Sequence, residues 1–330
     1  MTAAQVEQPA IGSGGSCWVC DHPHSTPWKP RSIDRKLVAE DLRISDAHYG
    51  RTLALRRCDQ CGFLFAEAGD LHELFQLYTE LDDPGYEESQ DSRILQMNWL
   101  LEALERHLPM QAPGADTGRS IAPGHQKGRL LDVGAASGLL VSVAAQRGWQ
   151  ATGVEPSHNL VRVARERHGV ELVQGSIPHP ALADQRFDAV LLVDVIEHVA
   201  DPRSLLDNAA QLLAPGGVLM VVTPDVASLA KQLLGRRWWH FRLAHVGYFD
   251  RRSFETAAER TGLEVVERFR AKWFFRVSYL AERLTRYLPV GFAVRALDRS
   301  ALGRFIAGRV VPLNLFDSWV FVCRKSPHEK

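Results

Sequence analysis

The sequence predicts an α/β protein, with a doubly wound, mostly parallel sheet of seven strands preceded by a small metal-binding module. Two observations carry this prediction. From Gly128 onward, short apolar runs alternate with segments of helical periodicity, as successive strand–helix–strand units do. Before that region, Cys17-x-x-Cys20 and Cys58-x-x-Cys61 form two cysteine pairs of the kind that hold one metal ion. A chain of 330 residues is long enough for both parts.

Composition limits the organisation and the class of partner. Lys+Arg and Asp+Glu number 39 each, so no global field draws the chain to nucleic acid. No apolar run reaches the length of a membrane span, and the N-terminus lacks the pattern of a secretory signal, so we expect a cytoplasmic protein. The expected segments are a disordered leader at 1–16, a zinc-ribbon-like module at 17–70, a helical region and linker at 71–127, and the α/β domain at 128–330.

The two cysteine pairs each offer two thiolates to one tetrahedral ion, and structural zinc is the predicted occupant. Disulfides are the less expected use in a chain without an export signal. A thioredoxin-like redox role would need a single pair at the start of a helix. His22 and His24 follow the first pair and are alternative ligands if one cysteine does not coordinate.

Between and after the cysteine pairs, short alternating segments such as 51–56 and 63–65 are predicted strands. Two helices are expected next, at 71–78 and at about 91–107, the second with an apolar stripe. Residues 109–128 are rich in Pro, Gly, Ala and Gln and are predicted to be a linker.

The first strand–helix–strand unit of the α/β domain holds the main candidate binding site. An apolar strand at 130–133 leads into the small-residue turn Gly134–Gly138, and a helix follows. Small residues there let a ligand or another backbone come close. The second strand ends on Glu155, whose carboxylate can accept hydrogen bonds from both hydroxyls of a ribose. These features predict a nucleoside-containing cofactor, although an ordinary unit with a small-residue turn would show the same pattern.

The turn does not match the dinucleotide fingerprint, because Val141 stands where a third glycine is required. Asp132 lies just before the turn, where a carboxylate would repel a pyrophosphate but suit an ammonium group. The segment resembles motif I of the class I S-adenosylmethionine-dependent methyltransferases, with Ala136 at the family's usual central glycine.

That resemblance implies a Rossmann-like methyltransferase fold and S-adenosyl-L-methionine as the cofactor. The residues expected to bind the cofactor are Asp132, Gly134, Ala135, Ala136, Gly138, Glu155, Pro156, Gly175, Ser176, Ile177, Asp194 and Val195.

The predicted fourth strand, Phe187 to Val193, ends in a segment that resembles motif IV of the same family, in the subgroup with Glu-His after the strand. Asp194 is expected to face the methionine end of the cofactor. His198 has the intrinsic pKa of a general base, but the alternative is a structural group that caps or bridges a loop. A helix begins next, with Asp201 as its N-cap and Pro202 in its first turn.

Residues 238–249 form an aromatic loop that contains His240 and His245. It is predicted to be a lid and acceptor pocket, or an aromatic plug over the sheet, and the two roles are compatible. A helix at 250–261 and two strands, from about 262 and at 317–323, should complete the sheet. His198, His245 and His240 are the candidate catalytic bases.

The segment 271–312, between the last two strands, is basic and aromatic. It carries eight Lys or Arg residues and two acidic ones, a net +6. We expect a helical insertion that caps the substrate, or that rests on an anionic membrane or a lipid-linked substrate.

The sequence therefore predicts transfer of a methyl group to an O or C atom of a small molecule, such as a sugar, a lipid-linked ring or a secondary metabolite. The cysteine pairs before this fold also resemble those of the sugar C-methyltransferases. The alternative is an RNA-directed methyltransferase or an RNA-binding protein that uses the zinc ribbon, which the balanced charge disfavours.

Overall fold

The computed structural model describes residues 16–43, 49–67, 69, 71–83, 90–108, 127–285, 287 and 300–326. Nearly all of the predicted leader, and residues 109–126 of the predicted linker, lie outside these ranges. Among the described residues, no helix is both long and apolar enough to cross a membrane.

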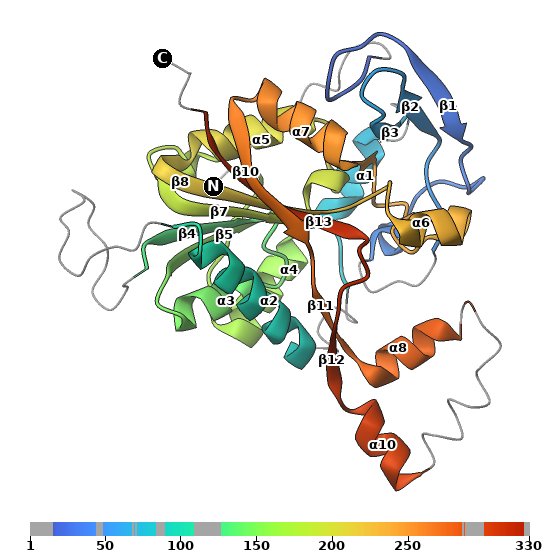
Figure 1. Ribbon diagram of the computed structural model, residues 1–330. Helices are drawn as coiled ribbons and strands as arrows, with labels where there is room; N and C mark the ends of the chain where they lie inside the picture. Colours follow the sequence, from blue (N-terminus) through green and yellow to red (C-terminus); the bar gives the residue numbers. More distant parts are fainter. Residues whose placement is uncertain are drawn as a thin grey trace.

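The central sheet has seven strands in the order β10-β13-β8-β7-β4-β5-β6 (Figure 1). Strands β4 to β8 pair in parallel, and β13 is antiparallel to both of its neighbours, β8 and β10. This confirms the predicted doubly wound, mostly parallel sheet. The strands are β4 (Arg129–Val133), β5 (Gln150–Glu155), β6 (Val173–Gln174), β7 (Phe187–Val193), β8 (Leu213–Pro224), β10 (Leu263–Arg270) and β13 (Ser318–Lys325).

Both faces of the sheet are covered, because successive side chains of each strand point to opposite sides. In β7, Ala189 and Leu191 join a buried cluster with α2 (Gln90–Glu105) and α3 (Leu139–Gln146). Val190 and Leu192 join the cluster on the other face, which the remaining large helices cover. Those helices are α5 (Pro202–Gln211) and α7 (Arg251–Arg260). The short helix α4 (His158–Val163) lies beside α3 instead, since Val161 packs against the cluster that contains Val141 of α3. Figure 1 shows the two helical layers on either side of the sheet.

Local signals place several helix ends as predicted. Asp201 Oδ1 accepts a hydrogen bond from the Ser204 amide at 2.9 Å, so it caps α5. The apolar run at 170–173 also predicts a strand, the third of the α/β domain, but β6 is shorter and begins only at Val173. Val170 and Leu172 pack with Val141 and Ala164 before strand pairing begins at Val173, so packing against α3 replaces pairing there.

The cysteine module is not an isolated unit. Its sheet contains β1 (Ser25–Lys29), β2 (Leu55–Cys58) and β3 (Leu64–Ala66), and β9 (Gly247–Tyr248) from the aromatic loop is the fourth strand. Asp21 also forms ion pairs with Arg203 on α5 and Arg260 on α7. The module and the α/β domain therefore share one buried core.

The predicted strand at 51–56 begins only at Leu55. The earlier part of that segment forms hydrogen bonds with the loop after β1 instead. The Thr52 amide donates to Ser32 Oγ, and the Thr52 carbonyl accepts from the Ser32 amide. The buried Lys29 ammonium holds this corner by donating to Ser32 Oγ and Thr52 Oγ1, both at 2.7 Å. The helix α1 (Leu71–Thr79) and the short α6 (Leu229–Leu234) complete the body.

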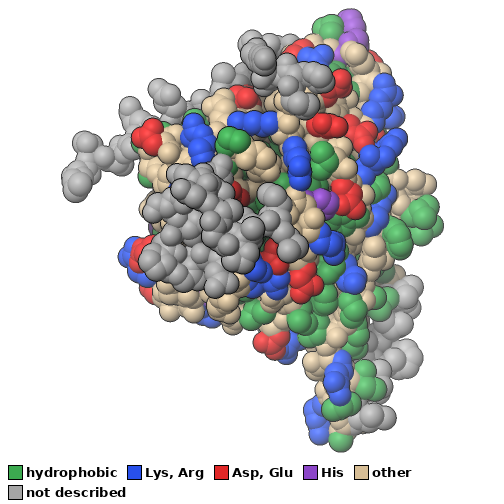
Figure 2. Space-filling model, turned by 60° about the vertical axis from the view of Figure 1, so that its left-hand side comes forward, with side chains coloured by type: hydrophobic (Ala, Val, Ile, Leu, Met, Phe, Trp, Pro, Cys, Tyr) green, Lys and Arg blue, Asp and Glu red, His purple; other side chains and the backbone are tan. Residues whose placement is uncertain are grey.

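The basic insertion forms a projecting arm, which we define as residues 273–285, 287 and 300–313 (Figure 1). It contains the antiparallel ribbon of β11 (Trp273–Arg276) and β12 (Val310–Leu313) and the helices α8 (Val277–Leu284) and α10 (Ala301–Ala307). The prediction of a helical insertion missed this ribbon, because its two strands lie more than thirty residues apart in sequence. Figure 2 shows Lys and Arg side chains beside apolar ones at the arm's lower end.

Candidate functional site

The candidate site lies where the carboxyl ends of β4 and β7 meet. These strands are neighbours, and chain connections leave them toward opposite sides of the sheet, which is where α/β sheets bind ligands. The turn Gly134–Gly138 follows β4, and a short 3-10 turn at Ile196–His198 follows β7. The sequence motifs predicted to bind cofactor and acceptor therefore lie side by side.

The small residues of the first turn are required by close contacts. Gly134 has φ +73°, and a Cβ there would lie 2.7 Å from Cγ2 of Val195. A Cβ at Gly138, with φ +75°, would lie 2.6 Å from Cγ2 of Val170. Ala136 adopts φ +48°, a left-handed conformation that glycine would adopt without strain. Gly134 thus allows the β7 loop to approach, and Gly138 allows the next helical segment to pack.

Glu155 is fully buried at the end of β5 and bridges this turn. Its Oε2 accepts from the Ala136 amide at 2.9 Å and its Oε1 from the Ser157 amide at 2.8 Å. Each carboxylate oxygen has a second lone-pair direction, so the group can also accept from two ribose hydroxyls. This arrangement fits the adenosyl part of S-adenosylmethionine.

Asp132 is buried beside Glu155. Burial, followed by the negative charge of Glu155, raises the pKa of Asp132 to about 8, and burial raises the pKa of Glu155 to about 7. Two carboxyl groups that resist ionisation in the cofactor-free protein are favourable neighbours for a cationic ligand. The pair therefore fits a cofactor that carries an ammonium and a sulfonium group.

The other predicted cofactor residues border the same edge. The Gly175 amide donates to the Glu155 carbonyl at 2.9 Å, which places the segment Gly175–Ile177 beside the end of β5. Pro156 follows Glu155 directly, and Ala135 is buried in the first turn. Contact of Ser176 and Ile177 with the adenine ring stays a prediction.

Asp194, at the end of β7, has a left-handed backbone with φ +53°, which aspartate tolerates better than most residues. Its Oδ1 is buried without a hydrogen-bond partner. Burial raises the pKa of Asp194 to about 6, the neighbouring His240 lowers it, and Asp317 raises it. A carboxylate with an unused oxygen therefore lies at the boundary between the cofactor turn and the aromatic loop.

Three side chains converge just beyond Asp194. Glu197 and His198 come from the 3-10 turn, and His245 comes from the aromatic loop. Each offers a metal-binding atom, and these three atoms lie within 4.8 Å of one another. The two imidazole rings are perpendicular, with centroids 4.7 Å apart. We call these three residues the Glu–His–His cluster.

Hydrogen bonds hold the cluster in place. His198 Nδ1 lies 3.0 Å from the Ala244 carbonyl, and the Val246 amide donates to the Glu197 carbonyl at 2.8 Å. The Thr223 hydroxyl donates to Glu197 Oε2 at 3.0 Å. The end of β8, the 3-10 turn and the aromatic loop are thereby joined.

Burial also sets the charge states in the cluster. It raises the pKa of Glu197 well above its usual value, with a further increase from Asp194. It lowers the pKa of His198 to about 4 and that of His245 well below the usual range. In the ligand-free protein, both histidines are therefore neutral near neutral pH.

His240 belongs to a neighbouring group. Its Nε2 lies 3.1 Å from Oδ2 of Asp317, and the same oxygen accepts from Trp239 Nε1 at 2.7 Å. The His240 ring is stacked against His245 with centroids 6.2 Å apart. All three predicted histidines are thus brought together at one edge.

The arm contacts this region. Tyr287 stacks on Tyr49 and donates to the Arg237 carbonyl at 3.2 Å, and the Arg283 guanidinium lies over the Tyr49 ring. Trp239 also meets Tyr287 edge-on. These contacts connect the insertion to the aromatic loop.

Sequence reasoning did not select Glu197 or Asp317. Glu197 could have been found from the sequence, since it is the first residue of the Glu-His pair that follows the fourth predicted strand. Asp317 carried none, because only the fold brings it to His240, which is 77 residues away in sequence.

The four predicted cysteine ligands also converge. Cys17 Sγ lies 3.6 Å from Cys61 Sγ, and Cys20 Sγ lies 3.5 Å from Cys58 Sγ. All four are buried, and their sulfurs lie within 4.8 Å of one another. The arrangement is compatible with one tetrahedrally bound ion and fits a zinc-ribbon-like module.

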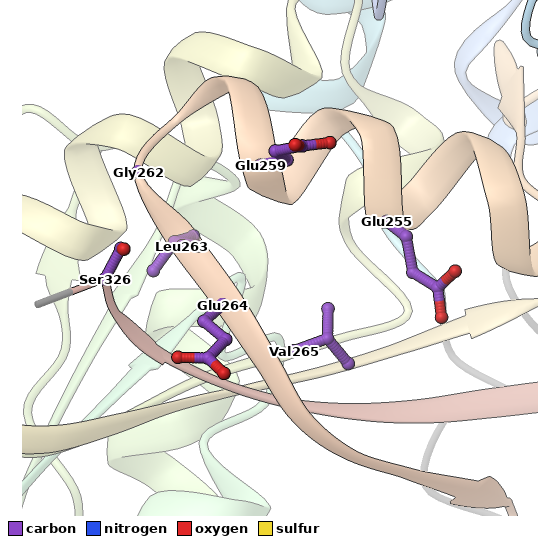
Figure 3. A pocket seen from close by; sticks show the side chains of 7 residues that line it. All are labelled: Glu255, Glu259, Gly262, Leu263, Glu264, Val265 and Ser326. Atoms are coloured by element: carbon purple, nitrogen blue, oxygen red, sulfur yellow. The ribbon is translucent and has the colours of Figure 1, made fainter. Parts of the chain in front are cut away.

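Figure 3 shows a hollow lined by Glu255 and Glu259 of α7 and by the start of β10. Leu263 begins β10, which runs parallel to β7, so this hollow lies at the opposite edge of the sheet from Asp194. It contains none of the candidate site residues.

Known proteins resemble this chain in the same region. The family described as a methyltransferase domain matches residues 83–268. The "Ubiquinone biosynthesis O-methyltransferase" of Cereibacter sphaeroides is 32% identical over 169 residues, which cover 47% of this chain and 68% of that protein. The protein of the same name from Caulobacter sp. is 40% identical over 86 residues, 24% of this chain and 34% of that protein.

A solved S-adenosylmethionine-dependent methyltransferase from Archaeoglobus fulgidus is 14% identical, with a TM-score of 0.46, and the match covers 73% of this chain and 98% of that chain. The family match extends over more than half of the chain, from the segment before α2 to β10, and includes both the cofactor turn and the Glu–His–His cluster. The chain belongs to the S-adenosylmethionine-dependent methyltransferases.

Proposed function

We propose that this enzyme methylates a hydroxyl oxygen on a small, ring-bearing acceptor. The observation that carries the proposal is the group of neutral histidines and carboxyl groups beside the cofactor turn, next to aromatic side chains. A hydroxyl must lose its proton before or during methyl transfer, and such groups can accept or orient that proton. The names of the matched relatives, ubiquinone biosynthesis O-methyltransferases, favour oxygen over carbon.

The protein's own residues would bind and align the two substrates. When bound, S-adenosylmethionine supplies a methyl group on a sulfonium sulfur, which keeps the electron pair of the broken bond. Glu155 would hold the ribose, and Asp132 and Asp194 would face the cationic methionine end. Alignment of the acceptor oxygen is the main contribution that the protein makes to such a displacement.

The histidines have distinguishable roles in this proposal. His198 Nδ1 faces the Ala244 carbonyl, which fixes its hydrogen there and leaves the Nε2 lone pair available. His240 is oriented by Asp317 and would contact the acceptor as a hydrogen-bond donor or acceptor. Trp239 and Tyr248 would provide the apolar walls.

An acceptor panel tests the proposed function. The full-length protein and S-adenosylmethionine are incubated separately with catechols and quinols, with sugars, and with RNA, and products are analysed by mass spectrometry and NMR. We expect one added methyl group, on oxygen, in a ring-bearing acceptor. Methylation of carbon in a sugar, or of RNA alone, would contradict the proposal and favour one of the alternatives from the sequence.

We also propose that the four cysteines hold a structural zinc ion. The short sulfur–sulfur distances and the burial of all four thiols support this. Two amides point at the sulfurs as well, since Val19 N lies 3.4 Å from Cys17 Sγ and Cys61 N lies 3.5 Å from Cys58 Sγ. Elemental analysis of the purified protein should find zinc.

Contact of the arm with an anionic membrane or a lipid-linked acceptor is a further proposal. Phe305 and Ile306 on α10 and Leu284 on α8 are exposed, with Arg304 and Arg309 nearby in the chain. Apolar side chains flanked by arginines are the combination that binds anionic membrane surfaces. The stacking of Tyr287 on Tyr49 would connect that contact to the acceptor site.

A further inference from the structure

The geometry points to a second metal site, in which Glu197, His198 and His245 bind one divalent cation at the carboxyl edge of the sheet. The cation-binding site stands on its own geometry. Its role in catalysis rests on the proposed function, because the cation would hold the acceptor's hydroxyl oxygen during methyl transfer.

The three ligand atoms are already assembled. One carboxylate oxygen and two ring nitrogens lie within 4.8 Å of one another, a spacing that a single ion between them would bridge. They come from two segments that are far apart in sequence, the 3-10 turn after β7 and the loop before β9.

Two of these side chains are buried with unused atoms. Glu197 is 1% exposed, and its Oε1 has no hydrogen-bond partner. His245 is 6% exposed, and its Nδ1 has none either. A buried polar atom without a partner costs roughly 1–3 kcal/mol, and a coordinated cation would remove that cost at both atoms.

The surrounding hydrogen bonds orient the ligands as they do around bound metals. The Ala244 carbonyl lies 3.0 Å from His198 Nδ1, which leaves the other ring nitrogen available as a ligand. The Thr223 hydroxyl donates to Glu197 Oε2, which leaves Oε1 available. Enclosure of both rings favours the neutral imidazole, which is the form that binds metals.

The local charges are compatible with a cation. Asp194 adds a carboxyl group close to Glu197, and Asp317 adds one close to Asp194. Arg242 and His240 oppose cation binding. Arg242 contributes positive charge near both histidines of the cluster, and His240 does so near His245 when it is protonated. The guanidinium is turned to other partners, with its Nε donating to the Trp239 carbonyl and its Nη1 to the Arg43 carbonyl.

A set of two imidazoles and one carboxylate suits Mn²⁺, Fe²⁺ or Zn²⁺, and three protein ligands leave coordination positions open. The acceptor oxygen would occupy one of them, and its hydroxyl proton would pass to solvent water, because a bound cation lowers the pKa of the hydroxyl. The O–CH₃ bond then forms as the S–CH₃ bond breaks, and the electron pair stays on sulfur. The products are the methyl ether and S-adenosylhomocysteine.

Mn²⁺ is the best probe, because it prefers nitrogen and oxygen ligands and does not compete for the cysteine thiolates. Zinc-loaded, full-length protein is titrated with Mn²⁺, and free Mn²⁺ is followed by its electron paramagnetic resonance signal. We expect about one Mn²⁺ bound per chain. Glu197→Gln and His245→Asn should each weaken this binding by at least about tenfold.

His240→Asn is the matched control, because His240 stacks on His245 but lies outside the cluster, and it should bind Mn²⁺ like the wild type. Circular dichroism and thermal unfolding report whether the variants are folded. If the variants are not folded, the titration of the wild type still tests the site. Wild-type protein that leaves the free Mn²⁺ signal unchanged contradicts the proposed metal site. Equal binding by wild type and both folded variants overturns it as well.

Experiments can contradict the metal site and the proposed function independently of each other. Chelator-treated protein that retains its zinc and methylates a hydroxyl at the full rate would exclude a catalytic cation while leaving O-methylation intact. Mn²⁺ bound through Glu197 and His245, with no hydroxyl methylated in the acceptor panel, would support the site and contradict the proposed function.

Discussion

The cysteine cluster and the Glu–His–His cluster both bring metal-binding atoms within 4.8 Å of one another, but they differ in chemistry and in place. Four thiols form the first, at the end of β2 in the small sheet of the module and in the turns beside it. Two imidazoles and a carboxylate form the second, at the edge of the large sheet beside the cofactor turn. A set of four protein ligands leaves no room for a substrate, whereas a set of three does. The first cluster is therefore suited to stability and the second to a reaction.

The largest expected effect comes from opening the closed cluster. Cys58→Ala should release the bound metal and lower the free energy of unfolding by several kcal/mol, because metal-binding free energy in such a site is folding free energy. Metal analysis and thermal unfolding measure both. Cys323→Ala is the control, since Cys323 is equally buried but lies in β13, away from the cluster. It should keep its metal and lose about 1 kcal/mol. A Cys58 variant as stable as the wild type would remove the distinction between the two clusters.

A second test addresses the reactive edge alone. Glu155→Ala should weaken the binding of S-adenosylhomocysteine by roughly 1.5–3 kcal/mol, the scale of hydrogen bonds to a charged group, without loss of the cysteine-bound metal. Isothermal calorimetry measures the affinity. Glu171→Ala is the control, because Glu171 is exposed and pairs with Arg165 on the surface. Unchanged affinity in the Glu155 variant would refute the ribose assignment.

A third test uses pH. Because the pKa of Asp132 is raised to about 8 and that of Glu155 to about 7, the folded, cofactor-free protein keeps protons that the unfolded chain releases near pH 4. Its stability therefore falls as pH rises from about 4 to about 8.

A bound ammonium group favours the ionised carboxylates, so cofactor binding should release protons and strengthen by up to about tenfold per pH unit between about pH 6 and pH 8. Thermal shifts with S-adenosylhomocysteine at the two pH values measure this. Asp132→Asn should flatten the dependence. An identical slope in wild type and variant would show that Asp132 does not face the cofactor.

The smallest effect on stability is expected in the arm. Phe305→Ser should change the free energy of unfolding by no more than about 0.5 kcal/mol, because Phe305 is 61% exposed. It should nevertheless reduce sedimentation with phosphatidylglycerol vesicles. Val266→Ser, at an exposed apolar position on β10, is the control and should leave vesicle binding unchanged. Wild-type protein that does not sediment with anionic vesicles would exclude the membrane contact.

Some features of the site were readable from local sequence because their physical causes are local. The β4 turn needs small residues between a strand and a helix, and β7 is apolar apart from Asp188, so both were predicted with nearly the correct ends. The ribbon of β11 and β12 and the addition of β9 to the module's sheet were missed. Their pairing depends on backbone hydrogen bonds between distant segments, which no short-range pattern specifies.

The sequence by itself determined the α/β sheet and the cofactor class, and it predicted that the four cysteines form one cluster. Periodicity, a turn of small residues and paired CxxC spacing are local constraints, and each is written within a few residues. Only the tertiary structure decided that Glu197 and His198 meet His245, and that Asp317 orients His240. Those side chains come from the ends of different strands and from the loop before β9, and the order of the strands in the sheet brings them together.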